Sequence, residues 1–314
     1  MPGSVRGLGL GYALDAVLGD PRRHHPVALL GQVALAFERR VYADSVARGG
    51  AHWTVCVVVP VAAAALAPRA RGSTLTTALL TWVVLGQRSL VTEGNALADA
   101  LERSDLTAAR SRLPALCGRD PSALDRDGLA RAGVESLAEN TSDAVVAPLL
   151  WGAVLGAPGL VGYRVVNTLD AMVGHRSARY RRFGRVAARA DDLANLLPAR
   201  ATALLTCAAA PLVGGSPAAA WAVWRRDGRR HPSPNSGQCE AAAAGALGVR
   251  LGGENVYSAG REVRPSLGDG PHPGTDDVRR AATLCGAVGV LGLGLAMGVA
   301  SAAAVVSRWQ GRAR

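Results

Sequence analysis

The chain has 314 residues, of which 49% are hydrophobic but only 4% aromatic and 19% charged, and its apolar residues are mostly Ala, Val and Leu, as is typical of membrane helices. The chain contains Arg but no Lys, which excludes a pyridoxal-phosphate enzyme, because its Schiff base needs Lys, and also a Walker-type phosphate loop. A formal net charge of +11 does not indicate nucleic-acid binding here, because the Arg residues are scattered and Phe and Tyr are too few to form stacking platforms.

Stretches without Asp, Glu or Arg predict where the chain crosses a membrane, since roughly 20 apolar residues span a bilayer. Three of them are predicted as firm spans, at about residues 51–68, 72–88 and 281–306, and the first two form a helical hairpin. Residues 7–19 are also apolar, but Asp15 interrupts them, and they lack the Arg-rich start and cleavage site of a signal peptide. We expect a shallow or buried segment there.

Two further apolar stretches, 144–163 and 201–224, are broken at their centres by turn signals, Gly156–Gly159 (GAPG) and Gly214–Pro217 (GGSP). Broken backbone at membrane depth is tolerated only where protein or a water-filled cavity shelters it. Each stretch is therefore predicted as a broken or re-entrant segment beside an active-site cavity. A re-entrant pair would return its flanks to one face, whereas two full spans would place them on opposite faces.

The predicted fold class is all-α: a polytopic helical membrane protein that forms one integral membrane domain over residues 1–314, with polar loops at 89–143, 164–200 and 225–280. The loop 164–200 carries eight Arg against three Asp, which favours the cytoplasmic side of a cell membrane. The cysteines are odd in number, widely spaced and without a C-x-x-C motif, so we expect reduced thiols at Cys56, Cys117, Cys207, Cys239 and Cys285.

Polar residues crowd before the first broken segment, in Glu135–Asp143 (ESLAENTSD). These residues are expected near the end of a helix that begins close to Ser122, where Glu135 and Glu139, four apart, share a face. Asp143 extends that face if the helix continues. Stacked carboxylates repel one another unless a cation or an Arg lies between them; the alternative is a solvated helix end.

After the first broken segment, Arg164, Asn167 and Asp170 recur every three residues, which places an anion binder, an amide and a carboxylate in one row of a helix. The alternative is a helix-start cap built on Asn167 or Thr168 with a surface ion pair. His175, which follows, is expected to be an ordinary loop histidine.

The mouth of the second broken segment carries Asp191 and Asp192, followed by Asn195 at helical spacing, an oxygen-rich set that suits Mg²⁺. The alternative is that the adjacent aspartates cap a helix. Beyond the segment lie His231–Gly237 (HPSPNSG) and Glu240. Small residues and Pro near a helix start expose backbone N–H groups, a usual way to hold phosphate.

Together these motifs resemble the adenosylcobinamide-phosphate synthase family of cobalamin biosynthesis, the CbiB/CobD membrane amide synthases. The resemblance covers nearly the whole chain, in ordered motifs of high specificity. The matching segments are Gly19–Pro21, His25–Val27 with Gly31, Glu135–Asp143, Asn167–Gly174, Arg179–Tyr180 with Phe183–Gly184, Asp191–Asp192 with Asn195, Pro198–Arg200, Ser233–Gly237 with Glu240, and Leu247–Gly253.

The chain departs from the family pattern at three places. Arg164 and Arg176 stand where Lys is usual, which keeps a phosphate-binding charge but changes its geometry. His175 replaces a commoner Tyr. Gln238 and Cys239 replace a usual Trp-Pro, a change expected to loosen the loop that precedes them.

The resemblance implies ATP-dependent amide formation between a propionate carboxylate of adenosylcobyric acid and an aminoalkyl phosphate of the aminopropanol phosphate type, giving adenosylcobinamide phosphate. The corrinoid is then a substrate, ATP a co-substrate and Mg²⁺ the cofactor. A carboxylate is a poor acylating agent, so ATP must activate it, and Arg with carboxylate-bound Mg²⁺ can neutralise the phosphates without Lys.

On this basis we assign hypothetical roles to the motif residues. The catalytic residues are Glu139, as the general base that frees the attacking amine, with Asp143 and Asp170. Metal ligands, or carboxylates that support them, come from Asp143, Asp170, Asp191 and Asp192. Substrate and phosphate binding falls to Asn140, Arg164, Asn167, Arg176, Asn195, Arg200, Ser233, Asn235 and Ser236.

Two alternatives from other classes stay open: a membrane transporter, since broken helices and ionisable groups at the membrane are also its features, and a non-catalytic regulator on the same fold. Against a transporter, no inverted repeat is visible and the charges lie outside the spans. The expected partners are the three small-molecule substrates and the lipid bilayer, with association to other late cobalamin-pathway membrane enzymes as a further expectation.

Overall fold

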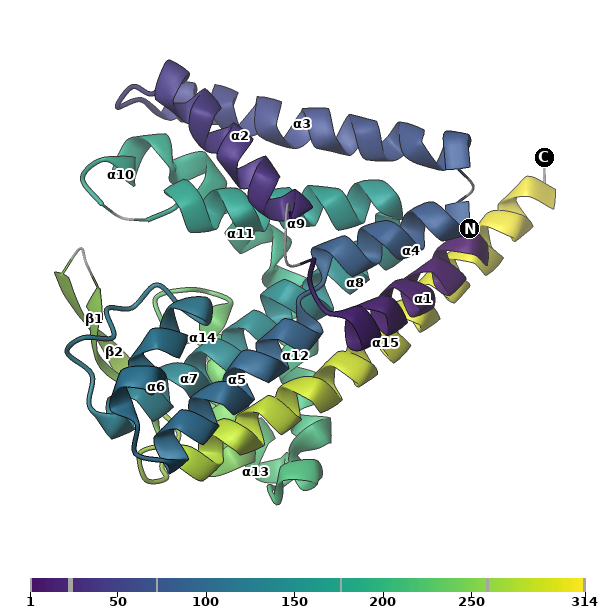
Figure 1. Cartoon of the computed structure of the whole chain (residues 1–314). Helices are drawn as coiled ribbons and strands as arrows, with labels where there is room; N and C mark the ends of the chain where they lie inside the picture. The colour runs from purple at the N-terminus through teal and green to yellow at the C-terminus, as the bar shows by residue number, and fades with distance from the viewer. Residues whose placement is uncertain (1, 22–24, 72, 176, 258–259, 313–314) are drawn as a thin grey trace. The chain divides into compact units, whose positions relative to one another are not determined.

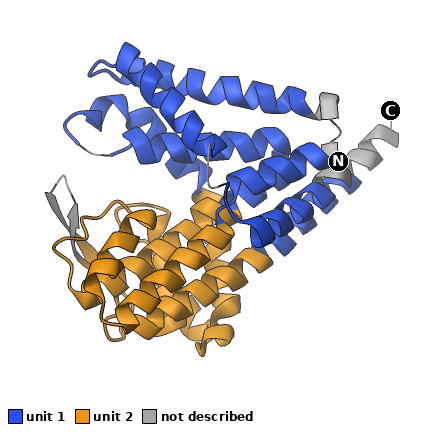
Figure 2. Ribbon diagram, viewed as in Figure 1, with its two compact units in different colours: residues 1–86, 147–195, 292–314 blue, residues 87–146, 196–291 orange. Residues whose placement is uncertain are grey.

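The computed structural model describes residues 2–21, 25–71, 73–175, 177–257 and 260–312, and its regular structure is almost entirely helical (Figure 1). The chain divides into two compact units (Figure 2). Unit 1 consists of Met1–Gly86, Ala147–Asn195 and Gly292–Arg314, and unit 2 of Gln87–Val146 and Leu196–Leu291. Each unit is assembled from segments far apart in the sequence. The expectation of one integral membrane domain stays a prediction.

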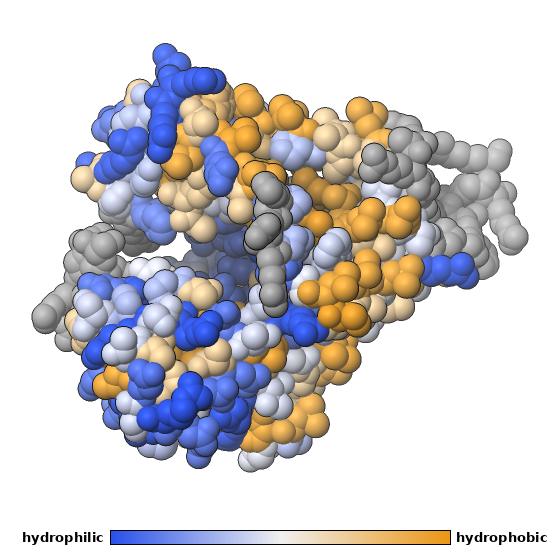
Figure 3. Space-filling view, in the orientation of Figure 1, coloured by the Kyte–Doolittle hydropathy of each residue, from blue (hydrophilic) through white to orange (hydrophobic). Residues whose placement is uncertain are grey.

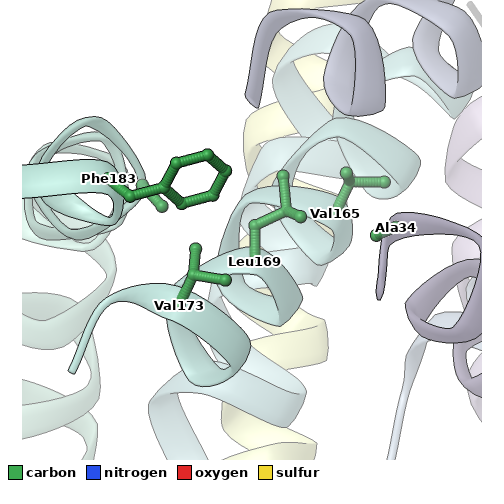
Figure 4. Close-up of a cluster of buried hydrophobic side chains, with 6 residues drawn as sticks. Ala34, Val165, Leu169, Val173 and Phe183 are labelled. Carbon is green, nitrogen blue, oxygen red and sulfur yellow. The ribbon is translucent and has the colours of Figure 1, made fainter. Parts of the chain in front are cut away.

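Unit 1 is built around one central helix. Its helices are α1 (Pro2–Leu18), α2 (Pro26–Val41), α3 (Val46–Arg71), α4 (Ser73–Val84), α8 (Ala147–Leu155), α9 (Ala157–Val173), α10 (Tyr180–Phe183) and α11 (Arg185–Ala194), together with the end of α15 (Thr275–Arg312). Helix α9 contacts α2, α3, α4, α8 and α11. Its residues Val165, Leu169 and Val173, four apart, form one apolar stripe against Ala34 and Phe183 (Figure 4).

Helices α1 and α4 of unit 1 approach each other closely through small residues. A Cβ atom added to Gly7 would lie 2.5 Å from the Cβ of Thr77, and one added to Gly11 would lie 2.4 Å from the Cβ of Thr81. Two glycines four apart leave a flat helix face, which allows two backbones to pack as membrane helices often do. The N-terminal apolar segment is thus a packed helix, and its Asp15 is fully buried, as expected of a buried segment.

Unit 2 contains α5 (Gln87–Glu102), α6 (Leu106–Arg112), the 3₁₀ turn Leu113–Ala115, α7 (Arg126–Thr141), a π-helical turn (Ser142–Val146), α12 (Leu196–Ala209), the 3₁₀ turn Ala210–Val213, α13 (Pro217–Asp227), α14 (Ser236–Leu247) and the start of α15. Every residue of α14 is buried. It packs against α7, α12 and α13, because its Ala- and Gly-rich sequence lets neighbouring backbones come close.

Unit 2 also holds a small antiparallel hairpin of β1 (Leu251–Tyr257) and β2 (Gly260–Leu267), in which Leu251 pairs with Leu267. A register irregularity between Leu251 and Gly253 is made by glycines with positive φ, since Gly252 and Gly253 have φ of 86° and 94°. This hairpin is the one departure from an all-α fold among the described residues.

Three helical segments are long and apolar enough to cross a membrane: Val46–Ala67, Leu196–Val213 and Thr275–Val305. Only 11% of the most apolar part of the first segment is buried, with Val59 63% and Leu66 60% exposed. Hydrophobic residues accordingly cover much of the surface of α3, whereas hydrophilic residues cover much of unit 2 around α5 and α6 (Figure 3). Apolar side chains exposed along a long helix are stable in lipid and costly in water, so the chain is an all-α membrane protein.

The predicted spans 51–68 and 281–306 fall within α3 and α15. The span predicted at 72–88 needs correction: α4 has 12 residues and ends at Val84, before Leu85-Gly86. Twelve residues rise only about 18 Å, which is less than the hydrocarbon thickness of a bilayer. The third long apolar segment is instead Leu196–Val213, half of the stretch that we expected to be too broken to span.

Both expected breaks are present. Gly156 separates α8 from α9 with φ 68° and ψ −145°, and residues 214–216 separate the turn after α12 from α13. The regions expected to be polar loops are largely helical, because Ala, Leu and Arg are strong helix formers even where the overall hydropathy is low.

Candidate functional site

Helix α7 carries the first group of candidate residues in unit 2. Asp125 caps its first turn by accepting a hydrogen bond from the amide of Gly128, so the helix begins at Arg126 rather than near Ser122. Glu135 is 1% exposed, pairs with Arg119 and accepts a hydrogen bond from the Gly252 amide at 2.7 Å. The alternative of a solvated helix end is therefore wrong for Glu135, and an Arg neutralises it as the carboxylate repulsion requires.

Glu139, one turn after Glu135, joins α7 to the start of α14. Its Oε1 accepts a hydrogen bond from the Ser236 hydroxyl at 2.5 Å across 97 residues of sequence. Asp143 lies half-buried in the π-helical turn. Burial raises the pKa of Cys239 well above its usual value, and the charges of Asp143 and Glu139 raise it further. Single π-turns within helices are frequent at functional sites. Asn140 donates its amide to the Leu116 carbonyl at 3.0 Å.

The loop that follows α13 is organised by its own side chains. Ser233 Oγ accepts hydrogen bonds from the amides of Asn235 and Ser236, at 3.3 and 3.2 Å, and the Ser233 amide donates to His231 Nδ1 at 3.0 Å. We expected backbone N–H groups exposed for phosphate. That expectation is wrong for these three amides, because a side chain already occupies each of them.

Gln238 holds this loop in place, contrary to the expectation that it would loosen it. Its Oε1 accepts from Trp224 Nε1 at 2.9 Å, and its Nε2 donates to the Gly228 carbonyl at 2.7 Å. A long amide side chain offers both a donor and an acceptor, so it ties α14 to the end of α13 at a buried position.

Arg200, near the start of α12, reaches the same loop. It donates to Leu196 O at 2.8 Å and lies 3.4 Å from Asn235 Oδ1 and 3.5 Å from the Pro234 carbonyl. The segments before and after the second broken stretch therefore lie together, as a hairpin requires. The structure thus brings together five of the predicted residues in unit 2: Glu139, Arg200, Ser233, Asn235 and Ser236.

Glu240 is a functional candidate for which sequence reasoning assigned no role. Its side chain is fully buried, 3.8 Å from both His231 Nε2 and Arg264 Nη1, and neither carboxylate oxygen accepts a hydrogen bond among the described residues. Burial raises the pKa of Glu240 well above its usual value, and the charges of Glu135 and Glu139 raise it further. The only sequence feature that indicates a role for Glu240 is its position after the Ser233–Gly237 motif. No motif in the sequence indicates a role for Arg119 or Arg264.

His231 is held neutral next to this carboxylate. Burial is the main cause that lowers the pKa of His231, and the charge of Arg264 lowers it as well. Because Nδ1 accepts the Ser233 amide, the neutral ring carries its proton on Nε2, the atom nearest Glu240. The imidazole thus bonds to the Ser233–Gly237 loop through Nδ1, while its Nε2 lies 3.8 Å from Glu240, beyond hydrogen-bond distance.

Unit 1 holds a second group of candidate residues, from α9 and α11. Asp191 accepts hydrogen bonds from Asn167 Nδ2 at 3.3 Å and Asn195 Nδ2 at 3.1 Å, and Asn195 Oδ1 accepts from the Tyr163 hydroxyl at 2.8 Å. Burial, with the charge of Asp170, raises the pKa of Asp191 to about 7. Two negative carboxylates repel each other, and a bound cation would relieve that repulsion.

Both capping alternatives for these residues are wrong. Asn167 and Thr168 lie in the middle of α9, which begins at Ala157, and Asp191 lies in the second half of α11. Arg164 shares α9 with Asn167 and Asp170, as the spacing of three predicted. Arg176 lies outside the described residues, and His175 is an exposed residue after α9.

The predicted metal ligands lie in both units: Asp143 in unit 2, and Asp191 and Asp192 in unit 1. Among the described residues, no group of three or more His, Cys, Asp or Glu side chains is arranged to hold a metal ion. Mg²⁺ is usually held by one or two carboxylates together with substrate phosphates. Asp191, whose pKa is raised by burial and by the charge of Asp170, fits such a partial site.

A cavity in unit 1 of about 570 Å³ collects residues of the N-terminal motifs. Asp20 and His25, which precede α2, line it together with Gly31 of α2 and Arg164 and Thr168 of α9. Asp20 and His25 belong to the motifs of the family resemblance, but the sequence predicts no role for them, because nothing in their spacing connects them to a helix more than a hundred residues later.

Known proteins resemble the chain over most of its length. The family model described as CobD/Cbib protein matches residues 8–285. The cobalamin biosynthesis protein CobD of Mycobacterium tuberculosis is 52% identical over 281 residues, 88% of this chain and 90% of the relative. That of Geobacter metallireducens is 47% identical over 268 residues, 82% and 84% of the two chains.

A third relative, the cobalamin biosynthesis protein CobD of Rhodobacter capsulatus, is 42% identical over 286 residues, 86% of this chain and 89% of the relative. No solved structure matches the chain. The family model and these relatives extend across both units, so the motifs gathered in each unit are parts of one family pattern. The chain belongs to the CobD/CbiB protein family.

Proposed function

We propose that this protein is an ATP-dependent amide synthase that joins an aminoalkyl phosphate to a propionate carboxylate of adenosylcobyric acid, giving adenosylcobinamide phosphate. A role in cobalamin biosynthesis follows from the family, whose relatives are named for that pathway. The observation that carries the specific reaction is the 2.5 Å hydrogen bond between Glu139 and Ser236, which joins two polar family motifs beside Arg200 and a buried carboxylate.

The reaction requires the carboxylate to be activated before the amine attacks. A carboxylate oxygen takes the terminal phosphoryl group of ATP and releases ADP; the amine nitrogen then attacks the carbonyl carbon, phosphate leaves and one proton is lost. In the proposal, Arg200 and Arg164 bind phosphate groups. Asn140, Asn167, Asn195, Asn235, Ser233 and Ser236 position polar parts of the substrates, and Arg176 is assigned to phosphate as well.

Glu139 is the proposed general base. Its carboxylate is half-buried and accepts a hydrogen bond from Ser236, which leaves its second oxygen to take a proton from the attacking ammonium. Asp143 and Asp170 act next to the reacting groups. In the proposal Asp143 of unit 2, and Asp191 and Asp192 of unit 1, each offer carboxylate oxygens to Mg²⁺. Mg²⁺ bound by such carboxylates and by substrate phosphate oxygens would neutralise phosphate charge.

We further propose that the protein lies in the cell membrane with the residues of both groups on the cytoplasmic side, where ATP is available. The eight Arg residues of segment 164–200 support that orientation. In the proposal the partners are the substrates and the lipid bilayer, with no nucleic acid, and other late cobalamin-pathway membrane enzymes are expected to associate with the protein.

The proposal is tested by turnover of detergent-purified protein with adenosylcobyric acid, aminopropanol phosphate, ATP and Mg²⁺, with the amide product followed by mass spectrometry. We expect product from the wild type and at least about a hundredfold less from Asp143→Ala. Asp44→Ala is the matched control, because Asp44 is exposed and pairs only loosely with Arg182, at 3.8 Å.

Two outcomes would overturn the proposal. Corrinoid or aminoalkyl phosphate that binds the folded protein without product would favour a transporter. Normal cobalamin production in cells that carry both Asp143→Ala and Asp170→Ala would favour a non-catalytic regulator.

A further inference from the structure

We infer that the 570 Å³ cavity of unit 1 is the binding site of the aminoalkyl phosphate, with Arg164 on the phosphate and Asp20 on the ammonium group. The identity of this ligand rests on the proposed function. Asp20 and His25, which the proposed mechanism does not use, would then bind the smaller substrate. The volume of the cavity lies within the range of roughly 300–1,000 Å³ that small-molecule sites occupy.

The charges of the cavity suit a zwitterion. An aminoalkyl phosphate carries an ammonium group at one end and a phosphate at the other, and the cavity offers a carboxylate from Asp20 and a guanidinium from Arg164. Oδ1 of Asp20 is buried and accepts no hydrogen bond among the described residues. A buried carboxylate oxygen is unfavourable unless a donor reaches it, and an ammonium group brings three.

His25 lines the same cavity and acts as a donor in the inferred site. Its Nδ1 accepts the Val27 amide at 3.2 Å, so the neutral ring carries its proton on Nε2. Burial lowers the pKa of His25; Asp20 raises it, and Arg164 lowers it. In the inferred site, a neutral imidazole with a fixed Nε2–H donates a hydrogen bond to a phosphate oxygen beside Arg164. It does not take the proton of the amine, so the general base is a different residue.

An apolar recess of about 110 Å³ adjoins the cavity and shares Val27, Arg164 and Thr168 with it. Leu30, Leu80, Val84 and Val165 also line it. Because Arg164 borders both spaces, a carbon next to the phosphate lies beside the recess, where a methyl substituent is buried. The recess therefore favours a methyl-bearing aminopropanol phosphate over unbranched ethanolamine phosphate.

The other substrates fit this cavity less well. ATP bears several negative charges and no ammonium group, so the Asp20 carboxylate would repel it. The corrinoid is far larger than the cavity, and its propionate is also an anion. The shorter zwitterion is the one substrate of the proposed reaction whose charges match both ends.

The test is calorimetric binding to wild-type protein in detergent with four ligands: 1-amino-2-propanol phosphate, isopropyl phosphate without the amine, 1-amino-2-propanol without the phosphate, and ethanolamine phosphate without the methyl group. We expect removal of either charged group to weaken binding about tenfold or more, and removal of the methyl group to weaken it about three- to tenfold. Equal binding of isopropyl phosphate and the full ligand would overturn the Asp20 assignment. Equal binding of ethanolamine phosphate would overturn the assignment of the recess.

Variants then locate the effect. Asp20→Asn should abolish the preference for 1-amino-2-propanol phosphate over isopropyl phosphate. Arg164→Gln should abolish the preference for 1-amino-2-propanol phosphate over 1-amino-2-propanol. Asp44→Asn and Arg182→Gln, an exposed pair of the same unit, are the matched controls and should keep both preferences. The ligand series on the wild type remains decisive even where a variant does not fold.

Failure of this inference is distinguishable from failure of the proposed function. Amide turnover with an unchanged KM for aminopropanol phosphate in both Asp20→Asn and Arg164→Gln would overturn the site and leave the synthase standing. Selective binding of the zwitterion in the cavity without any amide product would support the site and overturn the synthase.

Discussion

Glu139 shows how a single contact separates a structural role from a chemical one. Gln at this position keeps an oxygen to accept the hydrogen bond that Ser236 donates at 2.5 Å, but it cannot accept a proton. We therefore expect Glu139→Gln to fold normally and to lower kcat for amide formation by roughly 100- to 10,000-fold, with little change in KM. The exposed Glu102→Gln variant is the control. Retention of more than a tenth of kcat would assign Glu139 to structure alone.

Asp227 gives a prediction on stability and pH. It is fully buried, accepts hydrogen bonds from Arg226 and from the Gly268 amide at 2.9 Å, and forms an ion pair with Arg230 at 3.1 Å. The Arg226 hydrogen bond is the main cause that holds the pKa of Asp227 below its usual 3.8. Since the folded-state pKa is depressed, the stabilisation is fully present above pH 3.8 and is lost as the pH falls through the folded-state value.

We expect Asp227→Asn to lower the free energy of unfolding by about 2 kcal/mol at pH 7, a value reduced because both Arg partners are half-exposed. The difference from wild type should narrow below pH 3.8, in thermal unfolding of detergent-purified protein. Asp269→Asn, at a 73% exposed carboxylate that also pairs with Arg226, should change stability far less. A constant difference across pH would show that Asp227 acts through shape and not charge.

At the scale of elements, the connection between α8 and α9 depends on one glycine. Gly156 has φ 68° and ψ −145°, a backbone conformation that residues other than Gly rarely adopt. Three residues on, a Cβ added to Gly159 would lie 2.1 Å from the Trp151 carbonyl oxygen, so α8 and α9 pack with their backbones nearly in contact. The conformation of Gly156 thus fixes the break, and the missing side chain of Gly159 lets the two helices pack closely.

Gly156→Ala should therefore lower the free energy of unfolding by about 1–3 kcal/mol. Gly118→Ala is the control, because a Cβ added there meets no atom within 4 Å and its φ is not positive. Thermal unfolding in detergent compares the two variants. Equal stability of Gly156→Ala and Gly118→Ala would mean that the connection can rearrange at no cost.

At the scale of the whole molecule, topology follows from whether the second broken segment is a hairpin. Arg200 lies 3.5 Å from the Pro234 carbonyl, so the two flanks of the segment meet within unit 2. We expect Arg182→Cys and Arg229→Cys, each in a chain whose five native cysteines are replaced by Ala, to be labelled by a membrane-impermeant maleimide only in inverted vesicles. Both positions are exposed. Labelling from opposite sides would mean that Leu196–Val213 is a full span and that the flanks do not share a face.

The sequence by itself determined the membrane character, the helical class, the positions of both breaks and the order of the motifs, because these depend on composition, hydropathy and local backbone preferences. It also placed Arg164, Asn167 and Asp170 in one helical row. It overestimated 72–88 as a span, since apolar content alone does not show that a helix ends at Val84.

Only the tertiary structure decided which motifs meet. Asp20 and His25 share a cavity with Arg164, Glu240 is buried next to His231, and Gln238 ties the loop between α13 and α14 to both helices. These contacts join segments that are distant in the sequence and that tertiary packing brings together. Their energies depend on burial and on partners distant in sequence, and no local spacing encodes either.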